Sequence, residues 1–247
     1  AILVELDSGN VLAEHNSEDK IYPASLTKIM TAVLAIENTD DLSQTVTLPY
    51  DIFEQLYEEN ASMAGFQPGE EATLKDLLYG ILLPSGAECC MAFADRIAGS
   101  EEAFVDMMNQ KAAELGIGQT THFANPVGIY DENNYSTAYD MAVIMQAAMQ
   151  DDICKTVLSN HTYSTAATPQ HPENLNISNL FLRRIEDRMT SGEVIGAKTG
   201  FVNQSGNCAV SYEKAASGKT YICVTAGASS GWHCIDNHVY LYNTYGK

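Results

Sequence analysis

The stretch YPASLTKIM, residues 22–30, sets a serine and a lysine three positions apart at the start of an apolar run. Residues 29–36 contain almost no polar side chain, and a helix that is apolar on all sides belongs in the centre of a protein. We therefore predict a buried helix over about residues 25–36, preceded by Pro23. Residues i and i+3 of a helix share one face, with Cβ atoms about 5–6 Å apart, so Lys28 can reach the hydroxyl of Ser25.

The Ser25–Lys28 pair has two interpretations. A serine is a poor nucleophile until a neighbour accepts its proton, and a lysine accepts it only if burial, a helix N-terminus or a second cation destabilises the ammonium. In the other interpretation Ser25 caps the helix and Lys28 is a surface residue. The same spacing recurs at Ser17–Lys20, in a polar loop, and at Ser211–Lys214, at a strand end; only Ser25 opens an apolar helix.

A second cation is available in Lys198-Thr199-Gly200, the only K-T-G of the chain, which lies in a segment with strand periodicity. An edge strand with this motif offers an ammonium, a hydroxyl and a position without a side chain, so a peptide can add to it as a further strand with its carboxylate at one end. The alternative is a solvated lysine before a turn. Apolar residues on both sides of the motif favour the binding site.

Strand patterns lie at both ends of the chain and helical patterns lie between them. We predict strands over residues 2–6, 11–14, 194–201, 207–212 and 220–225, and helices over residues 73–83, 88–98, 100–115, 136–149 and 235–245. This order predicts an α+β fold: an antiparallel sheet of about five strands from both chain ends, flanked by helices, with an inserted mostly helical subdomain. The expected division of the single domain, residues 1–247, is a sheet subdomain of about 1–45 and 188–247 and a helical subdomain of about 46–187.

The composition excludes several classes of protein. The chain has 247 residues, of which 45% are hydrophobic, enough for a substantial core. Its net charge of −19 argues against nucleic acid and anionic membrane surfaces as partners. No run of about 20 apolar residues is present to span a bilayer. The first residues already read as a strand, which suggests a processed or trimmed N-terminus.

The six cysteines fit no zinc-binding spacing, and we interpret them as small apolar core residues. One pair is an exception. Cys208 and Cys223 lie on two strands that are expected to pair, and we expect them to face each other.

With these motifs in place, the chain resembles the serine D,D-peptidases, the low-molecular-weight penicillin-binding proteins of the D-alanyl-D-alanine carboxypeptidase type. The signature S-x-x-K, S-D-N and K-T-G is shared by these proteins and class A β-lactamases, and the middle motif reads S-x-N in the wider family. The likeness covers nearly the whole chain, including the segments Gln67–Glu70, Leu82–Gly86, Asn125–Gly128, Tyr135–Met141 and Asn179–Arg184.

The resemblance implies a role for each matching position. Ser25 would attack the carbonyl of the penultimate D-alanine and become acylated, Lys28 would accept its proton, and Ser85 would relay a proton to the leaving D-alanine. Lys198 and Thr199 would hold the terminal carboxylate of the substrate. The substrate-binding set then consists of Thr199, Gly200 and Phe201, and the backbone N–H groups of Phe201 and Ser25 would form the oxyanion hole.

The chain departs from the family pattern at two places. The middle motif reads Ser85-Gly86-Ala87, with alanine where the family has asparagine, so the amide that would contact the acyl chain and Lys28 is missing. Two other S-G-N triplets, residues 8–10 and 205–207, lie outside the helical region and are interpreted as decoys. Relatives often carry an arginine just before the closing helix that supports carboxylate binding. Here no arginine follows Arg188, and His233 is either a substitute or an ordinary surface histidine.

The resemblance favours a serine-type D-Ala-D-Ala carboxypeptidase that removes the terminal D-alanine from peptidoglycan stem peptides and is acylated by penicillins. A class A-like β-lactamase is one alternative, but it needs a glutamate in E-x-x-L-N, and the nearest match, residues 173–176, is one residue short. The other alternative is a penicillin or peptidoglycan sensor without turnover. The missing amide favours it, whereas the retained nucleophile, base, relay serine and K-T-G favour the enzyme.

The resemblance also implies a setting for the protein. No metal or organic cofactor is expected. The expected partners are the peptidoglycan stem peptide and, as covalent inhibitors, β-lactam antibiotics. The expected location is extracytoplasmic, in the cell wall or at the outer face of the cytoplasmic membrane, although the chain carries no signal. Relatives often continue into a β-rich domain and a membrane-anchoring helix, which this chain lacks, so anchoring of the full-length protein stays open.

Overall fold

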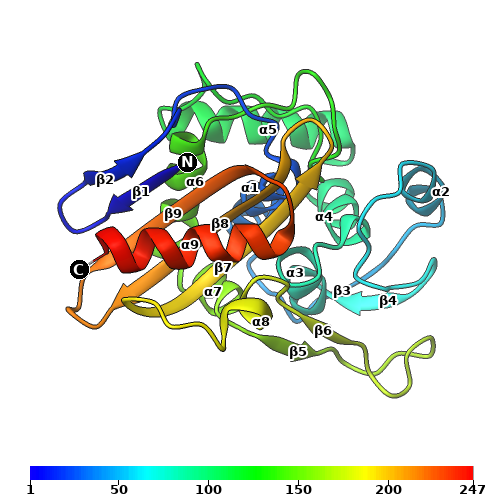
Figure 1. Cartoon of the computed structure of the whole chain (residues 1–247). Helices are drawn as coiled ribbons and strands as arrows, with labels where there is room; N and C mark the ends of the chain where they lie inside the picture. The colour runs from blue at the N-terminus through cyan, green and yellow to red at the C-terminus, as the bar shows by residue number, and fades with distance from the viewer. Residues whose placement is uncertain (247) are drawn as a thin grey trace.

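The central sheet has five antiparallel strands in the order β2-β1-β9-β8-β7, as seen in a computed structural model that describes residues 1–246 (Figure 1). The strands are β1 (Ile2–Glu5), β2 (Asn10–Glu14), β7 (Gly192–Val202), β8 (Gly206–Ala215) and β9 (Thr220–Ala228). β1 pairs with β9, so that Ile2 lies opposite Val224. The predicted α+β fold, with one sheet from both chain ends, is therefore confirmed.

Both faces of the inner strands β1, β8 and β9 are largely buried, which explains why these strands are apolar without a clear polar side. Along β9, Ile222 and Val224 face one core with the helices of the middle of the chain, while Tyr221 and Cys223 face a second core under the last helix. Figure 1 shows this last helix, α9 (Gly231–Tyr245), lying across the sheet on the side opposite α1 (Thr27–Glu37).

The remaining helices follow the predicted pattern closely where they are long. Their bounds are α2 Asp51–Glu58, α3 Leu74–Leu82, α4 Ala87–Ala98, α5 Glu101–Glu114, α6 Ala138–Gln150, α7 Asp152–Leu158 and α8 Leu182–Ile185. Thr73 and Ser100, the first residues of two of the predicted helical ranges, are the N-caps and accept hydrogen bonds from Asp76 N and Ala103 N. α9 begins at Gly231, ahead of the predicted residue 235, because Ser230 caps it by accepting from His233 N.

Two small two-stranded antiparallel sheets escaped prediction, β3–β4 (Thr45–Thr47 with Glu71–Thr73) and β5–β6 (Thr162–Ser164 with Asn176–Ser178). Each strand has only three residues, too few to show an alternating pattern. The subdomain boundaries stay a prediction. Nowhere in residues 1–246 does a helix have the length and apolarity needed to cross a membrane.

The expected facing of Cys208 and Cys223 is wrong. Cys223 lies opposite Ser211 in the β8–β9 register. The side chain of Cys208 belongs to the core on one face of the sheet and that of Cys223 to the core on the other face. All six cysteines are free and buried, as the core interpretation expects.

Candidate active site

Ser25 lies in a single 3₁₀ turn, η1 (Ala24–Leu26), which leads directly into α1. Lys28, in the first turn of α1, donates from Nζ to Ser25 Oγ at 3.0 Å and to the carbonyl oxygen of Val127 at 2.5 Å. Only 2% of Lys28 is exposed, and burial lowers its pKa because water no longer stabilises the ammonium. The amine is therefore within hydrogen-bonding distance of the serine hydroxyl, and its lowered pKa favours the neutral form that can accept a proton.

A second serine–lysine pair lies beside the first. Lys198 Nζ, from β7, donates to Ser85 Oγ and to the carbonyl oxygen of Thr199, both at 2.9 Å. Lys198 is 1% exposed, and burial, followed by repulsion from Lys28, lowers its pKa well below the usual range. Ser85, between α3 and α4, has a φ of +74°, a conformation that non-glycine residues rarely adopt and that occurs often at functional sites.

Two glycines let the backbone on either side approach Ser25. A Cβ atom on Gly200 of the K-T-G motif would lie 2.9 Å from Ser25 N, and one on Gly128 would lie 1.9 Å from the carbonyl oxygen of Ala24. Neither position has space for a side chain. The backbones of strand β7 and of the 125–128 loop thus both lie in close contact with the turn that carries Ser25.

These groups surround one cleft of about 280 Å³. Of the predicted site residues, Ser25, Ser85, Thr199, Gly200 and Phe201 line the cleft, and Lys28 and Lys198 lie behind its wall, bonded to the two serines. The other lining residues are Asn60, Ser62, Leu180, Arg184, Asn207, Cys208, Gly231 and Cys234. The structure therefore brings all seven predicted residues together around one cleft.

Ala87, which stands where the family has asparagine, is buried next to the cleft-lining residue Ser62. Ala87 is 0% exposed, and its N–H donates to the carbonyl oxygen of Ser62. Asn207, from one of the two S-G-N triplets interpreted as decoys, does line the cleft, although from β8; its Nδ2 donates to the Ala228 carbonyl. His233 does not line the cleft, and its Nδ1 is hydrogen-bonded to Ser229 Oγ.

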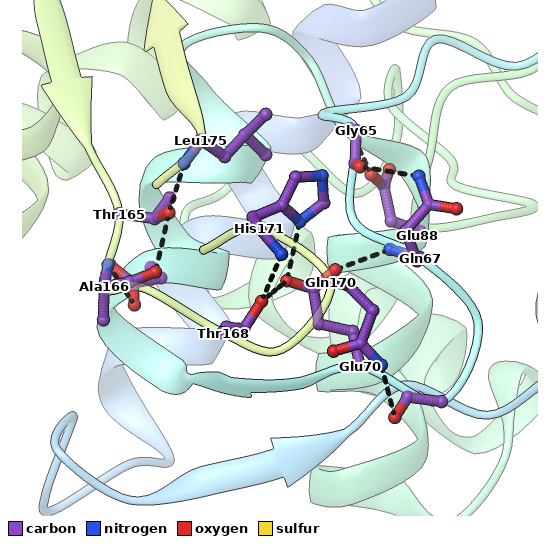
Figure 2. Close-up of polar contacts among 12 residues, drawn as sticks. Gly65, Gln67, Glu70, Glu88, Thr165, Ala166, Thr168, Gln170, His171 and Leu175 are labelled. Carbon is purple, nitrogen blue, oxygen red and sulfur yellow. Dashed lines mark hydrogen bonds and ion pairs between the residues drawn. The ribbon is translucent and has the colours of Figure 1, made fainter. Parts of the chain in front are cut away.

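Buried carboxylates hold the segment that follows the cleft-lining residues Asn60 and Ser62 (Figure 2). Glu88, which follows Ala87 in α4, accepts hydrogen bonds from Ala64 N at 2.7 Å and Gly65 N at 2.9 Å. Burial raises the pKa of Glu88. Glu70 accepts from Gln67 N and is paired with His171 at 2.9 Å. The cleft wall after Ser62 is therefore tied to α4 and to the 168–171 loop.

Two contributors to this site were missed from the sequence. The Val127 carbonyl, which accepts from Lys28, is a backbone group without a side-chain signature; only its place in N-P-V-G, within the family likeness, pointed to it. Arg184 lines the cleft from α8, a helix of four residues that the sequence pattern did not reveal.

Known proteins of similar sequence carry the name D-alanyl-D-alanine carboxypeptidase. A sequence profile described as D-alanyl-D-alanine carboxypeptidase matches residues 1–230. The D-alanyl-D-alanine carboxypeptidase DacF of Bacillus subtilis is 35% identical over 231 residues, which cover 93% of this chain and 57% of that protein. DacC of Escherichia coli is 36% identical over 159 residues, covering 61% and 39%. The chain thus spans about half the length of these relatives, or less.

The fold has a solved counterpart of nearly the same extent. The crystal structure of the Streptomyces K15 DD-transpeptidase superimposes with a TM-score of 0.87 at 26% identity, covering 98% of this chain and 95% of that one. The profile match extends over most of the chain and includes every residue that lines the cleft except Gly231 and Cys234. The chain belongs to the D-alanyl-D-alanine carboxypeptidase family.

Proposed function

We propose that this chain is the catalytic domain of a serine-type D-Ala-D-Ala carboxypeptidase that removes the terminal D-alanine from peptidoglycan stem peptides. The observation that carries the proposal is the pair of buried serine–lysine contacts, Lys28–Ser25 and Lys198–Ser85, at one cleft. The family relationship and the names of the relatives supply the substrate class.

The proposed reaction begins with attack by Ser25 Oγ on the carbonyl carbon of the penultimate D-alanine, while neutral Lys28 takes the hydroxyl proton. Backbone N–H groups of Ser25 and Phe201 stabilise the oxyanion. The amide C–N bond then breaks, Ser85 relays the proton taken by Lys28 to the leaving amine, and free D-alanine departs. Water adds to the resulting ester, which releases the shortened peptide and restores Ser25.

The same serine is proposed to open the β-lactam ring of penicillins and to remain acylated. No carboxylate is found among the cleft-lining residues within the described part of the chain, so the cleft offers no obvious general base for rapid release of the acyl group. This supports a long-lived acyl-enzyme over β-lactamase activity. The proposed location is extracytoplasmic, where the peptidoglycan lies.

The test is to incubate the protein with a peptide ending in D-Ala-D-Ala and, separately, with a fluorescent penicillin. Release of D-alanine together with a persistent covalent label is expected, and Ser25→Ala should abolish both. A label that clears within minutes would identify a β-lactamase. A stable label without D-alanine release would identify a sensor, a result to which the missing amide at Ala87 would contribute.

A further inference from the structure

Glu88 is a buried carboxylate that the proposed reaction does not use. It lies in the first turn of α4 and is 0% exposed. Figure 2 shows it beside Gly65: its Oε1 accepts from Ala64 N at 2.7 Å and from Gly65 N at 2.9 Å. Within residues 1–246 its Oε2 is buried without a hydrogen-bond partner. Burial of a carboxylate is costly, so its position needs an explanation.

The segment that Glu88 holds has no regular structure of its own. Residues 59–70 form neither helix nor strand, so their buried N–H groups need partners from elsewhere in the fold. The two N–H groups that bond to Glu88 obtain theirs from its carboxylate. In the same segment, the carbonyl oxygen of Ser62 accepts from Ala87 N at 2.8 Å. The start of α4 therefore fixes residues 62–65, the wall segment, which begins at the cleft-lining Ser62.

The wall segment lies in close contact with the turn that carries Ser85. A Cβ built on Gly86, the next residue, would lie 2.6 Å from Ala64 Cβ and 3.0 Å from Glu88 Oε2. Ala64 and Glu88 thus fill the space beside Gly86. Ser85 itself has a φ of +74°, a conformation that a non-glycine residue keeps only where its surroundings determine it. The wall segment and Glu88 form these surroundings on one side.

We infer that Glu88 is a positioning residue for Ser85. It holds the wall segment against the Ser85 turn and so keeps the Ser85 hydroxyl where Lys198 Nζ donates to it, 2.9 Å away. Glu88 is fully buried and does not line the cleft, so it acts through other residues. The relay of a proton by Ser85 rests on the proposed function, whereas the positioning rests on contacts within the free protein.

The leaving group of the substrate reports on Ser85. An amide releases an amine, which must gain a proton as the C–N bond breaks. A thioester releases a thiolate, which is stable without a proton near the ordinary thiol pKa of about 8.5. Displacement of Ser85 should therefore slow amide cleavage more than thioester cleavage. General damage to the cleft would slow both alike, because attack by Ser25 is common to them.

The experiment measures kcat/KM for a peptide ending in D-Ala-D-Ala and for the same peptide with sulfur in place of the scissile N–H. Glu88→Ala removes the acceptor, Glu88→Gln keeps an oxygen for the two N–H groups, and Gly86→Ala displaces the wall segment while the carboxylate stays. Glu70→Ala is the matched control. Glu70 is also buried, but its carboxylate bonds to Gln67 N and to His171.

We expect Glu88→Ala to lower kcat/KM for the peptide at least about tenfold more than for the thioester, part of the roughly 10²–10⁴-fold that general acid–base catalysis contributes. Gly86→Ala should change the ratio of the two values in the same direction. Glu88→Gln should restore most of the wild-type ratio. Glu70→Ala should leave the ratio unchanged, even if its urea midpoint falls.

Equal losses on both substrates in Glu88→Ala and Gly86→Ala, or the same change of ratio in Glu70→Ala, would overturn the inference. If Glu88→Ala does not fold, the ratio in Gly86→Ala decides alone. A wild-type protein that releases no D-alanine removes the proposed function instead. Acylation by a fluorescent penicillin, whose ring nitrogen also gains a proton, then replaces the peptide in the ratio and still tests Glu88. No reaction with any of the three compounds removes both.

Discussion

At the scale of single residues, the chemistry depends on which of two buried amines is neutral. Burial is the largest cause of the lowered pKa of both Lys28 and Lys198. For Lys198, repulsion from Lys28 adds to the effect of burial, because two ammonium groups in one dry region destabilise each other. Such coupling is reciprocal, and the pair therefore favours a state with one proton.

Replacing Lys198 by methionine should raise the pKa of Lys28, because the neighbouring positive charge is removed. In the proposed mechanism neutral Lys28 is needed for acylation, so the rate should rise with pH through the pKa of Lys28, and this acid limb should move to higher pH in Lys198→Met. The maximal rate should also fall, by about 10²-fold or more, because Ser85 loses its partner. Stopped-flow acylation by a fluorescent penicillin across pH 5–10 measures both effects.

The exposed lysine variant Lys155→Met is the control for this experiment and should have the profile of the wild type. An acid limb that stays in place in Lys198→Met would mean that Lys28 is not the base or is not coupled to Lys198.

At the scale of elements, the position of Ser25, the proposed nucleophile, depends on how closely the 125–128 loop approaches η1. Gly128 has a φ of +77° and no space for a Cβ, whereas Gly9, in the β1–β2 turn, has a φ of +73° with nothing within 4 Å of the same point. Replacement of either by alanine costs about 1–3 kcal/mol for the backbone conformation. The two substitutions differ because only the alanine at position 128 would clash with the carbonyl oxygen of Ala24.

We expect Gly128→Ala to destabilise the protein more than Gly9→Ala in urea unfolding, and to lower the rate of penicillin acylation by at least about tenfold, because the turn that carries Ser25 must move. Gly9→Ala should acylate at the wild-type rate. Equal acylation rates in the two variants would show that the approach of this loop does not position the serine.

The contact of α9 with the sheet contains a buried histidine. His238 Nδ1 lies 2.7 Å from Ser211 Oγ, its Nε2 lies 3.0 Å from Thr225 Oγ1, and burial lowers its pKa to about 3. An unfolded chain protonates this ring below about pH 6.5. The contribution of the neutral ring to stability is therefore full above pH 6.5 and is lost as the pH falls toward 3.

Wild-type protein should accordingly lose stability relative to His238→Gln as the pH is lowered from 6.5, with a slope of up to about 1.4 kcal/mol per pH unit. The measurement is urea unfolding between pH 4 and 7.5, with the exposed residue variant His15→Gln as the control, whose curve should parallel that of the wild type. Parallel curves for His238→Gln as well would contradict the assignment of a neutral buried ring.

At the scale of the whole molecule, stability depends on a sheet whose neighbouring strands are far apart in sequence. β1 covers one edge of β9, and Ile2 and Leu3 are 1% and 0% exposed. Deleting residues 1–14 would uncover that edge and both apolar side chains. We expect the deletion to abolish cooperative unfolding, measured by circular dichroism in urea, whereas a variant cut only at the β1–β2 turn should keep it. Cooperative unfolding of the deletion variant would show that β1 is dispensable.

Much of this arrangement could be predicted from the sequence, and the reason is local. The long helices have side-chain caps such as Thr73 and Ser100, and β7, β8 and β9 are runs of 11, 10 and 9 residues, long enough to be recognised as strands. The site was predictable because S-x-x-K sets two side chains on one face of a helix and K-T-G is rare enough to be recognised. Both are short-range signals.

What escaped prediction depends on long-range geometry. The hydrogen bonds of Glu88 to the backbone of Ala64 and Gly65 join residues that are distant in sequence, and none of these residues alone is unusual. The facing of Cys208 and Cys223 required the register of β8 on β9, which shifts between Asn207 and Ala209. A change of one position moves a side chain to the other side of a sheet, and no local pattern specifies it here.

The pairing of β1 with β9 has a consequence for how the protein is made. The chain is synthesised from its N-terminus, so β1 cannot pair with β9 until residues beyond Val224 have left the ribosome. The nucleophile turn is synthesised early but gains its K-T-G neighbour only after residue 200. The native site therefore forms only after most of the chain has been translated. A nascent chain that stops earlier would be inactive, and its unpaired strands would be exposed to chaperones.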